Sequence, residues 1–186
     1  MVEKLSNFPF KWNGKEYWYS RSIVCSNYIF CKYCGEWYVL VAQRSDDSTW
    51  PKRWNVPGGF LDHDETTLEC AIRETFEETG FYIPDDSKVV LHNINDHNRQ
   101  GKQHIIFSYY TNLGEVELTP WVSSRSDETA TVDWIPVKKA GYFTWIPGQY
   151  EMIHDIFQQH INNSTFRDWM MDKIFKYFAN MTYIKS

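Results

Sequence analysis

The sequence predicts an α+β fold in which helices cover both faces of a mixed β-sheet, giving an α/β/α sandwich. Three observations lead to this prediction. Runs of β-branched and aromatic residues recur through residues 18–145, as the strands of a sheet require. One amphipathic helix interrupts them at residues 66–79, and helical periodicity returns after Pro147. The 186 residues suffice for one domain with a sizeable core and a modest appendage.

The elements before and after the helix follow from their turn residues. Asn13-Gly14 predicts the turn of an N-terminal hairpin within residues 1–17. Two strand-like runs at residues 22–31 and 36–44 meet at a tight turn, and a short extended piece leads to Gly58-Gly59. Beyond the helix, strands are expected at residues 81–83, 88–94, 104–113 and 130–136, with turns at Asp85-Asp86, Gly101 and Gly114 and a short helical turn at residues 137–141.

The C-terminal part of the chain changes to helical spacing. Apolar residues recur at three- and four-residue steps from Tyr150 to Ile161, and a polar break separates them from a second helix near Thr165. We therefore divide the chain into a domain at 1–161, with its core at about 18–145, and a helical extension at 162–186. The second helix is rich in apolar residues, which predicts a homodimer contact through Trp169, Met170, Met171, Ile174, Phe175, Tyr177 and Phe178.

Composition and charge exclude several classes of protein. The formal charge is −5 without a cluster of basic residues, so no face for duplex nucleic acid is expected. No apolar run reaches the roughly 18–20 residues that span a bilayer, so no membrane partner is expected. The N-terminus lacks the pattern of a secretory signal, which predicts a cytoplasmic protein with reduced cysteines. Cys31 and Cys34 form a CxxC pair, but no second pair completes a zinc site.

The helix at 66–79 carries three carboxylates, Glu74, Glu77 and Glu78, at i, i+3 and i+4 spacing. They repel one another and lie near the helix C-terminus, where the helix dipole disfavours anions. Such a cluster favours a hard divalent cation, which takes oxygen ligands, although a solvated acidic face is the simpler alternative. The glutamates are expected opposite a core-facing stripe of Leu68, Ala71, Ile72, Thr75, Phe76 and Thr79.

Residues 59–81 resemble the signature of the Nudix hydrolases, which lies on a loop and the helix that follows it. The signature requires a glycine, a glutamate, an Arg-Glu pair, a Glu-Glu pair and a second glycine at fixed spacing. Its fixed positions are occupied by Gly59, Glu65, Arg73-Glu74, Glu77-Glu78 and Gly80. Thr75 and Phe81 stand where the family has aliphatic residues, and both are packing positions. The flanking strands extend the resemblance over about residues 18–145. It implies a Nudix-like fold, here with extra C-terminal helices, and an enzyme acting on phosphoric anhydrides.

The resemblance implies a Mg²⁺-dependent pyrophosphohydrolase in which Mn²⁺ can substitute. Its substrate would be a nucleotide-type small molecule, a nucleoside diphosphate linked to another group, such as ADP-ribose, a dinucleotide or a nucleotide sugar. Glu74, Glu77 and Glu78 would bind the metal, with the Gly58 carbonyl as a further ligand. Arg73 would orient a carboxylate of the motif, and Glu65 would be its structural partner.

The resemblance leaves the general base among several acids, because the family uses either a motif glutamate or an acid on a later loop. Glu128, six residues before Trp134, is the first candidate, with Asp127 next and Glu115 and Glu117 behind them. Arg44 and Arg53 are candidates for binding phosphate. The histidines His63, His92, His97 and His104 follow no metal spacing and are expected at surfaces or in loops. The alternative function is a non-catalytic nucleotide-sensing module.

Overall fold

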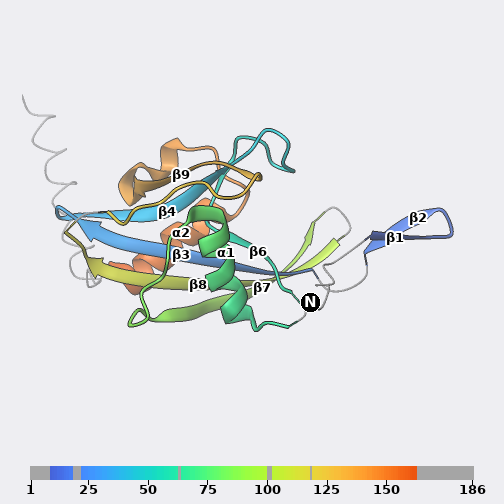
Figure 1. Cartoon of the computed structure of the whole chain (residues 1–186), viewed down its shortest axis with the longest axis horizontal. Coiled ribbons are helices and arrows are strands. Elements are labelled where there is room, and N and C mark those ends of the chain that lie inside the picture. Colours follow the sequence, from blue (N-terminus) through green and yellow to red (C-terminus); the bar gives the residue numbers. More distant parts are fainter. Residues whose placement is uncertain (1–8, 19–21, 63, 100–101, 118, 163–186) are drawn as a thin grey trace, which may run out of the picture.

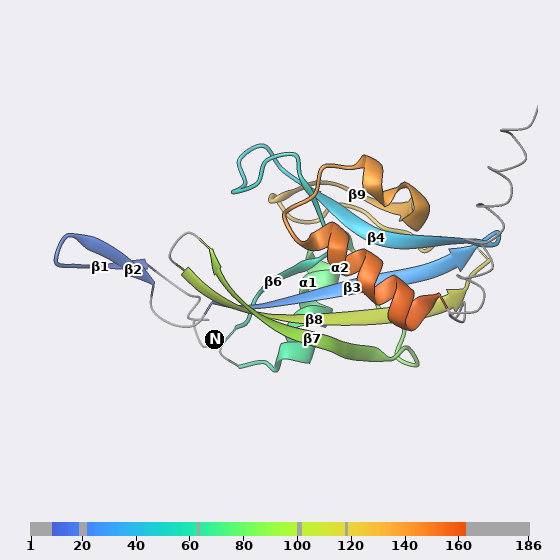
Figure 2. The same cartoon turned by 180° about the vertical axis from the view of Figure 1, so that it is seen from behind.

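The computed structural model describes residues 9–162, apart from residues 19–21, 63, 100–101 and 118. A mixed sheet forms its centre, and two helices, α1 (Thr67–Thr79) and α2 (Gln149–Ile156), cover opposite faces of it, as Figures 1 and 2 show from the two sides. The predicted α/β/α sandwich is therefore confirmed. The second C-terminal helix and its homodimer contact fall outside the described residues, and so that prediction stays untested.

The N-terminal hairpin consists of β1 (Pro9–Trp12) and β2 (Lys15–Trp18), and both turn residues, Asn13 and Gly14, have positive φ. The central sheet has the order β5-β4-β3-β8-β7, with β6 also paired to β3 and β9 to β4. Only β3 and β8 run parallel among these pairs. Its strands are β3 (Ser22–Tyr33), β4 (Glu36–Arg44), β5 (Trp54–Asn55), β6 (Gly58–Phe60), β7 (Val89–Arg99), β8 (Lys102–Glu115) and β9 (Thr129–Pro136).

The strands β3 and β4 diverge away from the turn that joins them. They pair from Phe30–Val39 to Tyr33–Glu36, and beyond this point the segment at residues 54–60 enters the gap. There β5 pairs with β4, and β6 pairs with β3. The backbone N–H of Asn27 also donates to the Pro57 carbonyl at 3.0 Å. This wedge between two strands fixes the Gly58-Gly59 segment against the sheet.

The helix α1 has the predicted position and caps. Thr66 and Glu69 form a capping box at its start, and Gly80 ends it in the left-handed region with φ 65°. Half of the predicted stripe is buried, namely Ala71, Thr75 and Thr79, whereas Leu68, Ile72 and Phe76 are 38–40% exposed. Cys70 joins the three buried residues, and the small side chains on this face let the helix approach the sheet closely. The two threonine hydroxyls donate to helix carbonyls, which satisfies them in the core.

Two predicted elements after the helix are wrong. Residues 81–83 are not a strand: Phe81 and Ile83 are buried in an irregular segment, and Phe81 packs edge-on against Trp134. Gly114 is not a turn but lies inside β8, with φ 68°, where the register against β3 shifts. A short apolar run can be a packed irregular segment as well as a strand, and a glycine can mark a bulge as well as a turn.

The largest part of the core lies between the sheet and the C-terminal helical region. After the 3₁₀ segment η1 (Val137–Tyr142), α2 continues into the π-helical turn η2 (Phe157–Ile161). Ile153, Ile156 and Ile161 are buried against Phe30 and its neighbours in β4. No helix in the described part of the chain is long and apolar enough to cross a membrane.

Candidate active site

Arg73 lies on α1 and joins three carboxylates of the motif. Its Nε and Nη2 donate to the two oxygens of Glu65 at 2.9 and 2.6 Å, a bidentate pair. Its Nη1 donates to Glu74 at 2.7 Å and to Glu77 at 2.8 Å. Nη2 also reaches the carbonyl of Phe60 at 3.1 Å, which ties the helix to β6. One guanidinium thus fixes the loop and the outer carboxylates in a single arrangement.

This guanidinium determines the charge state of its partners. Hydrogen bonds from Arg73 lower the pKa of Glu65 to about 2, although partial burial acts in the opposite direction. The pKa of Glu74 is raised, because burial outweighs the hydrogen bond and charge of Arg73. The pKa of Arg73 itself is raised, chiefly by its hydrogen bonds to Glu65. Glu65 therefore stays ionised and acts as the anchor of Arg73.

Glu78 lies on the other side of α1, where it is only 6% exposed. The backbone N–H of Gly58 donates to its carboxylate at 3.1 Å, and no ion pair joins it to any described residue. Burial raises the pKa of Glu78 to about 8, and the charges of Glu74 and Glu128 act in the same direction. The expectation that all three glutamates project away from the core is wrong for Glu78. The helix turns this carboxylate toward the sheet, because its close-packed face is the small-residue face.

Gly58 and Gly59 are glycines because of close approaches. A Cβ on Gly59 would lie 2.4 Å from the Glu74 carboxylate, and a Cβ on Gly58 would lie 2.4 Å from the carbonyl oxygen of Cys25. Any larger residue at 59 would occupy the space of a motif carboxylate. The segment at residues 54–60, which lies between β3 and β4, therefore places a backbone without side chains next to the acidic side of α1.

Two predicted residues outside the motif come together beside it. Arg44 ends β4 and Glu128 precedes β9, and Arg44 Nη2 lies 2.9 Å from Glu128 Oε2. The charges of both side chains act on Glu78, Arg44 lowering its pKa and Glu128 raising it. The loop before Glu128 also touches the helix end, since Ser123 N donates to the Thr79 carbonyl at 2.9 Å. The structure thus groups Arg44 and Glu128 with the motif glutamates.

Other predicted candidates lie elsewhere or have other partners. Arg53 donates to the Trp145 carbonyl at 2.8 Å, and its guanidinium lies over the ring of Trp50. Glu115 forms an ion pair with Lys32 at the far end of β3, six residues from the β6 pairing at Ser26, or about 20 Å along the strand. Asp127 is exposed in the loop next to Glu128.

The donor set of the motif suits a hard divalent cation, although the carboxylates are not arranged as a cage. Among the described residues, no group of three His, Cys, Asp or Glu side chains converges where a metal could sit. Arg73 instead occupies oxygens of Glu74 and Glu77, and Glu78 faces Gly58. Mg²⁺ usually takes one or two carboxylates and completes its shell with waters and substrate phosphates. Burial favours the protonated form of Glu78, and a bound cation would take the place of that proton.

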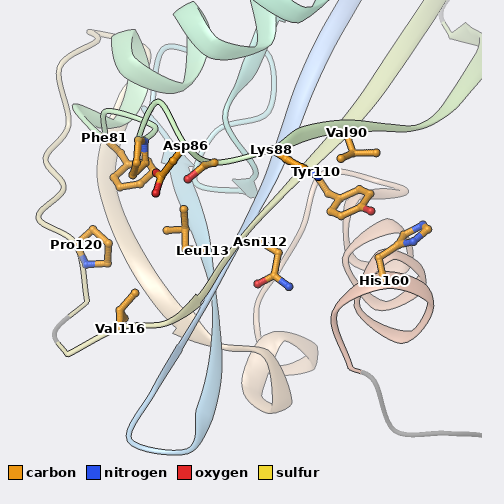
Figure 3. A pocket seen from close by; sticks show the side chains of 12 residues that line it. Phe81, Asp86, Lys88, Val90, Tyr110, Asn112, Leu113, Val116, Pro120 and His160 are labelled. Atoms are coloured by element: carbon orange, nitrogen blue, oxygen red, sulfur yellow. The ribbon is translucent and has the colours of Figure 1, made fainter.

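A separate pocket of about 660 Å³ lies at the far end of the sheet. Figure 3 shows Phe81, Val116 and Pro120 on one side of it and Tyr110 and His160 on the other. The pocket shares only Phe81 with the motif, whose carboxylates do not line it. It is therefore distinct from the acidic site.

Beside this pocket lies a histidine cluster that the sequence analysis missed. His92, expected at the surface, has a side chain only 4% exposed. Its ring nitrogens lie 3.0 Å from Asp155 and 2.9 Å from His160, whose ring stacks on Tyr110. These residues are far apart in the sequence, and no spacing signal could have joined them.

Comparison with known proteins extends these findings. The sequence pattern of the NUDIX domain matches residues 30–156. The m7GpppN-mRNA hydrolase of Saccharomyces cerevisiae (strain ATCC 204508 / S288c) is 30% identical over 105 residues, 54% of this chain and 10% of the yeast protein. The chain therefore spans about a tenth of the length of that relative.

Two solved structures share the fold. The NUDIX domain of Shewanella oneidensis NrtR complexed with ADP ribose matches with a TM-score of 0.64 at 16% identity, over 76% of this chain and 89% of that one. A C. elegans Ap4A hydrolase, solved as a binary complex, matches with a TM-score of 0.60 at 19% identity, over 74% of this chain and 96% of that one.

Proposed function

The chain belongs to the Nudix hydrolase family, and from this premise we propose that it is a divalent-metal-dependent pyrophosphohydrolase. The observation that carries the proposal is the set of motif glutamates around a bare glycine backbone, with one buried carboxylate, Glu78, that no described cation neutralises. A glutamate on an ordinary acidic helix face stays in water, whereas Glu78 is buried and its pKa is raised. A site that receives a cation together with its substrate accounts for that burial.

The proposed cofactor is Mg²⁺, with Mn²⁺ as a substitute. Glu74, Glu77 and Glu78 would hold it, with the Gly58 carbonyl as a further ligand. When bound, it would supply positive charge to the phosphate oxygens and make water more acidic. Arg73 and Glu65 would hold the outer carboxylates in place, because their bidentate pair fixes the guanidinium that contacts Glu74 and Glu77.

The proposed general base is Glu128, on the loop that follows β8. Its carboxylate lies close enough to the motif for its charge to raise the pKa of Glu78, and it is accessible at the surface, with a side chain 67% exposed. In the proposed reaction Glu128 accepts a proton from the water that attacks a phosphorus of the pyrophosphate. The bond to the bridging oxygen breaks, and the two phosphate-ended products leave.

The proposed substrate is a nucleoside diphosphate linked to another group. The two structural neighbours support this class, since one was solved with ADP ribose and the other is a hydrolase of Ap4A. The name of the yeast relative, m7GpppN-mRNA hydrolase, adds capped RNA to the compounds worth testing. Arg53 remains a candidate for contacting the substrate phosphates.

The test is a hydrolysis panel with Mg²⁺ or Mn²⁺ over ADP-ribose, diadenosine polyphosphates, nucleotide sugars and capped RNA. The variants are Glu77→Gln and, as a matched control, Glu151→Gln, which removes an exposed glutamate in the first turn of α2. We expect at least one substrate to be cleaved by the wild type and the control, and not by Glu77→Gln, with circular dichroism unchanged. Full activity of Glu77→Gln would overturn the proposal, and nucleotide binding without turnover would indicate the sensing function.

A further inference from the structure

We propose that Arg44 is a positioning residue that holds the Glu128 carboxylate beside the motif, and that it promotes hydrolysis through Glu128 and not through a contact with phosphate. The inference rests on the proposed function, in which Glu128 is the general base. It changes the role expected of Arg44 from the sequence, which is that of a candidate for binding phosphate.

The backbone brings the two residues together. In the pairing of β4 with β9, Arg44 lies opposite Thr129, so Glu128 is the last residue before the strand and borders Arg44. The N–H of Ser45 donates to the Glu128 carbonyl at 2.8 Å, which holds the main chain on this side. The N–H of Glu128 receives a second restraint, because it donates to the hydroxyl of Ser126 at 3.1 Å. The main chain at Glu128 is therefore fixed on both sides, and one further contact is enough to fix the position of its side chain.

Arg44 supplies that contact. Its Nη2 donates to Glu128 Oε2 at 2.9 Å, a distance typical of a charge-assisted hydrogen bond. The Arg44 side chain is only 17% exposed, whereas that of Glu128 is 67% exposed. The hydrogen bond from the largely buried guanidinium limits the positions that the exposed carboxylate can take. The Nε of Arg44 is also buried and has no hydrogen-bond partner among the described residues, so little of this guanidinium faces solvent, where a phosphate would arrive.

The charges around the site agree with this role. Arg44 and Glu128 act on the pKa of Glu78 with opposite sign, so the effect of one opposes that of the other. A mobile Glu128 without Arg44 would leave an uncompensated anion near the motif glutamates. The pair therefore places a base next to an acidic site at a small electrostatic cost.

Positioning and phosphate binding predict different kinetics. If Arg44 acts through Glu128, then Arg44→Met lowers kcat about 10- to 100-fold and leaves KM within about twofold, because misplacing a reacting group by about 1 Å costs up to 10²-fold. Glu128→Gln lowers kcat about 10²- to 10⁴-fold. The double variant is then no slower than Glu128→Gln alone, because the group that Arg44 positions is already lost. Direct phosphate binding predicts instead a raised KM for Arg44→Met and multiplied losses in the double variant.

A second readout does not depend on turnover. Amide hydrogen exchange at Ser45 and Glu128 should quicken in Arg44→Met, because the side-chain bond that steadies this backbone pairing is gone. The matched control is Lys32→Met, which breaks an ion pair of 3.0 Å at the far end of β3 and should change neither kcat nor exchange at these amides.

The outcomes separate this inference from the proposed function. A kcat loss confined to the Glu128-containing background, together with faster exchange at Ser45, supports it. Unchanged exchange in Arg44→Met, or a KM increase that persists when Glu128 is glutamine, overturns it. If Glu77→Gln stays fully active, the proposed function fails, and the exchange result still decides whether Arg44 orders Glu128.

Discussion

Glu65 and Glu78 lie at the two ends of one loop–helix unit, and burial raises the pKa of both, but only Glu65 has a cation that reverses this effect. At the Glu65 end a bidentate arginine neutralises the carboxylate and lowers its pKa to about 2. At the Glu78 end no described cation makes contact, and burial raises the pKa to about 8. One end is a completed structural ion pair. The other is a carboxyl group without a cationic partner. Within one acidic motif, the carboxyl group that lacks a cation therefore indicates where an external cation would bind.

The largest expected effect tests the completed end. Arg73→Met leaves Glu65, whose side chain is 11% exposed, as a buried charge without its partner. We expect the free energy of unfolding to fall by about 3–5 kcal/mol, as is usual when one member of a buried pair is removed. Urea unfolding followed by tryptophan fluorescence measures this fall. A loss below about 1 kcal/mol would show that Arg73 serves the motif without stabilising it.

The second prediction tests the incomplete end through pH. In the folded chain Glu78 has a pKa near 8, against about 4.3 when unfolded, so the folded state holds the proton more tightly. Stability is therefore greatest below the unfolded pKa and is lost as the pH rises through the folded one, by on the order of 4 kcal/mol between pH 5 and pH 9. Glu78→Gln cannot ionise and should lack this loss.

Urea unfolding at pH 5 and pH 9 in the presence of EDTA measures this difference. Adding Mg²⁺ at pH 9 should restore stability to the wild type and not to Glu78→Gln, since only the ionised carboxylate gains from the cation. If the free energy of unfolding depended on pH in the same way in the wild type and in Glu78→Gln, ionisation of Glu78 would not destabilise the fold, which would contradict the prediction.

The third prediction compares the effects of substituting the two adjacent glycines, Gly58 and Gly59. Gly58→Ala places a Cβ against the carbonyl of Cys25, and that backbone is fixed by pairing in β3, so we expect a loss of about 1–3 kcal/mol. Gly59→Ala meets only the end of the Glu74 side chain, which can move. It should lose activity with a smaller loss of stability. Thermal unfolding and the hydrolysis assay, run on both variants, check the contrast; equal stability losses would refute it.

The smallest effect concerns the exposed side of α1. Ile72 is 38% exposed, so Ile72→Gln should change the free energy of unfolding by no more than about 0.5 kcal/mol. The matched variant Ala71→Val adds volume on the buried face of the same helix and should cost about 1–3 kcal/mol. Chemical unfolding of both variants tests this assignment, because burial of Ile72, which the predicted stripe requires, would make Ile72→Gln as costly as Ala71→Val.

The fold class and the ends of α1 could be predicted because they depend on local signals. Thr66 and Gly80 are residues whose conformation and hydrogen bonds end a helix wherever it packs. The buried face of α1 could be predicted only in part, since the small residues of the predicted stripe are buried and its large residues are not. It depends on how closely the helix approaches β3, and that distance favours alanine and threonine over the larger leucine, isoleucine and phenylalanine.

The residues of the candidate site divide in the same way. Arg73 and its glutamates are neighbours along one helix, so their spacing alone brings them together. Arg44 and Glu128 are 84 residues apart, and only the register of β4 against β9 shows that they meet. Glu115 is a lower-ranked candidate for the base in sequence, and the register of β8 against β3 places it at the far end of the sheet.

The parallel pairing of β3 with β8 has a consequence for how the protein folds. It joins residues about 80 positions apart, so the diverging strands, the glycine segment and α1 all lie within one loop that this pairing closes. Closing a long loop costs chain entropy before any contact repays it, and sheets built from distant segments fold slowly. On a growing ribosomal chain the motif glutamates are synthesised before the strand that completes their platform. The sheet under α1 is therefore complete only after β8 has emerged.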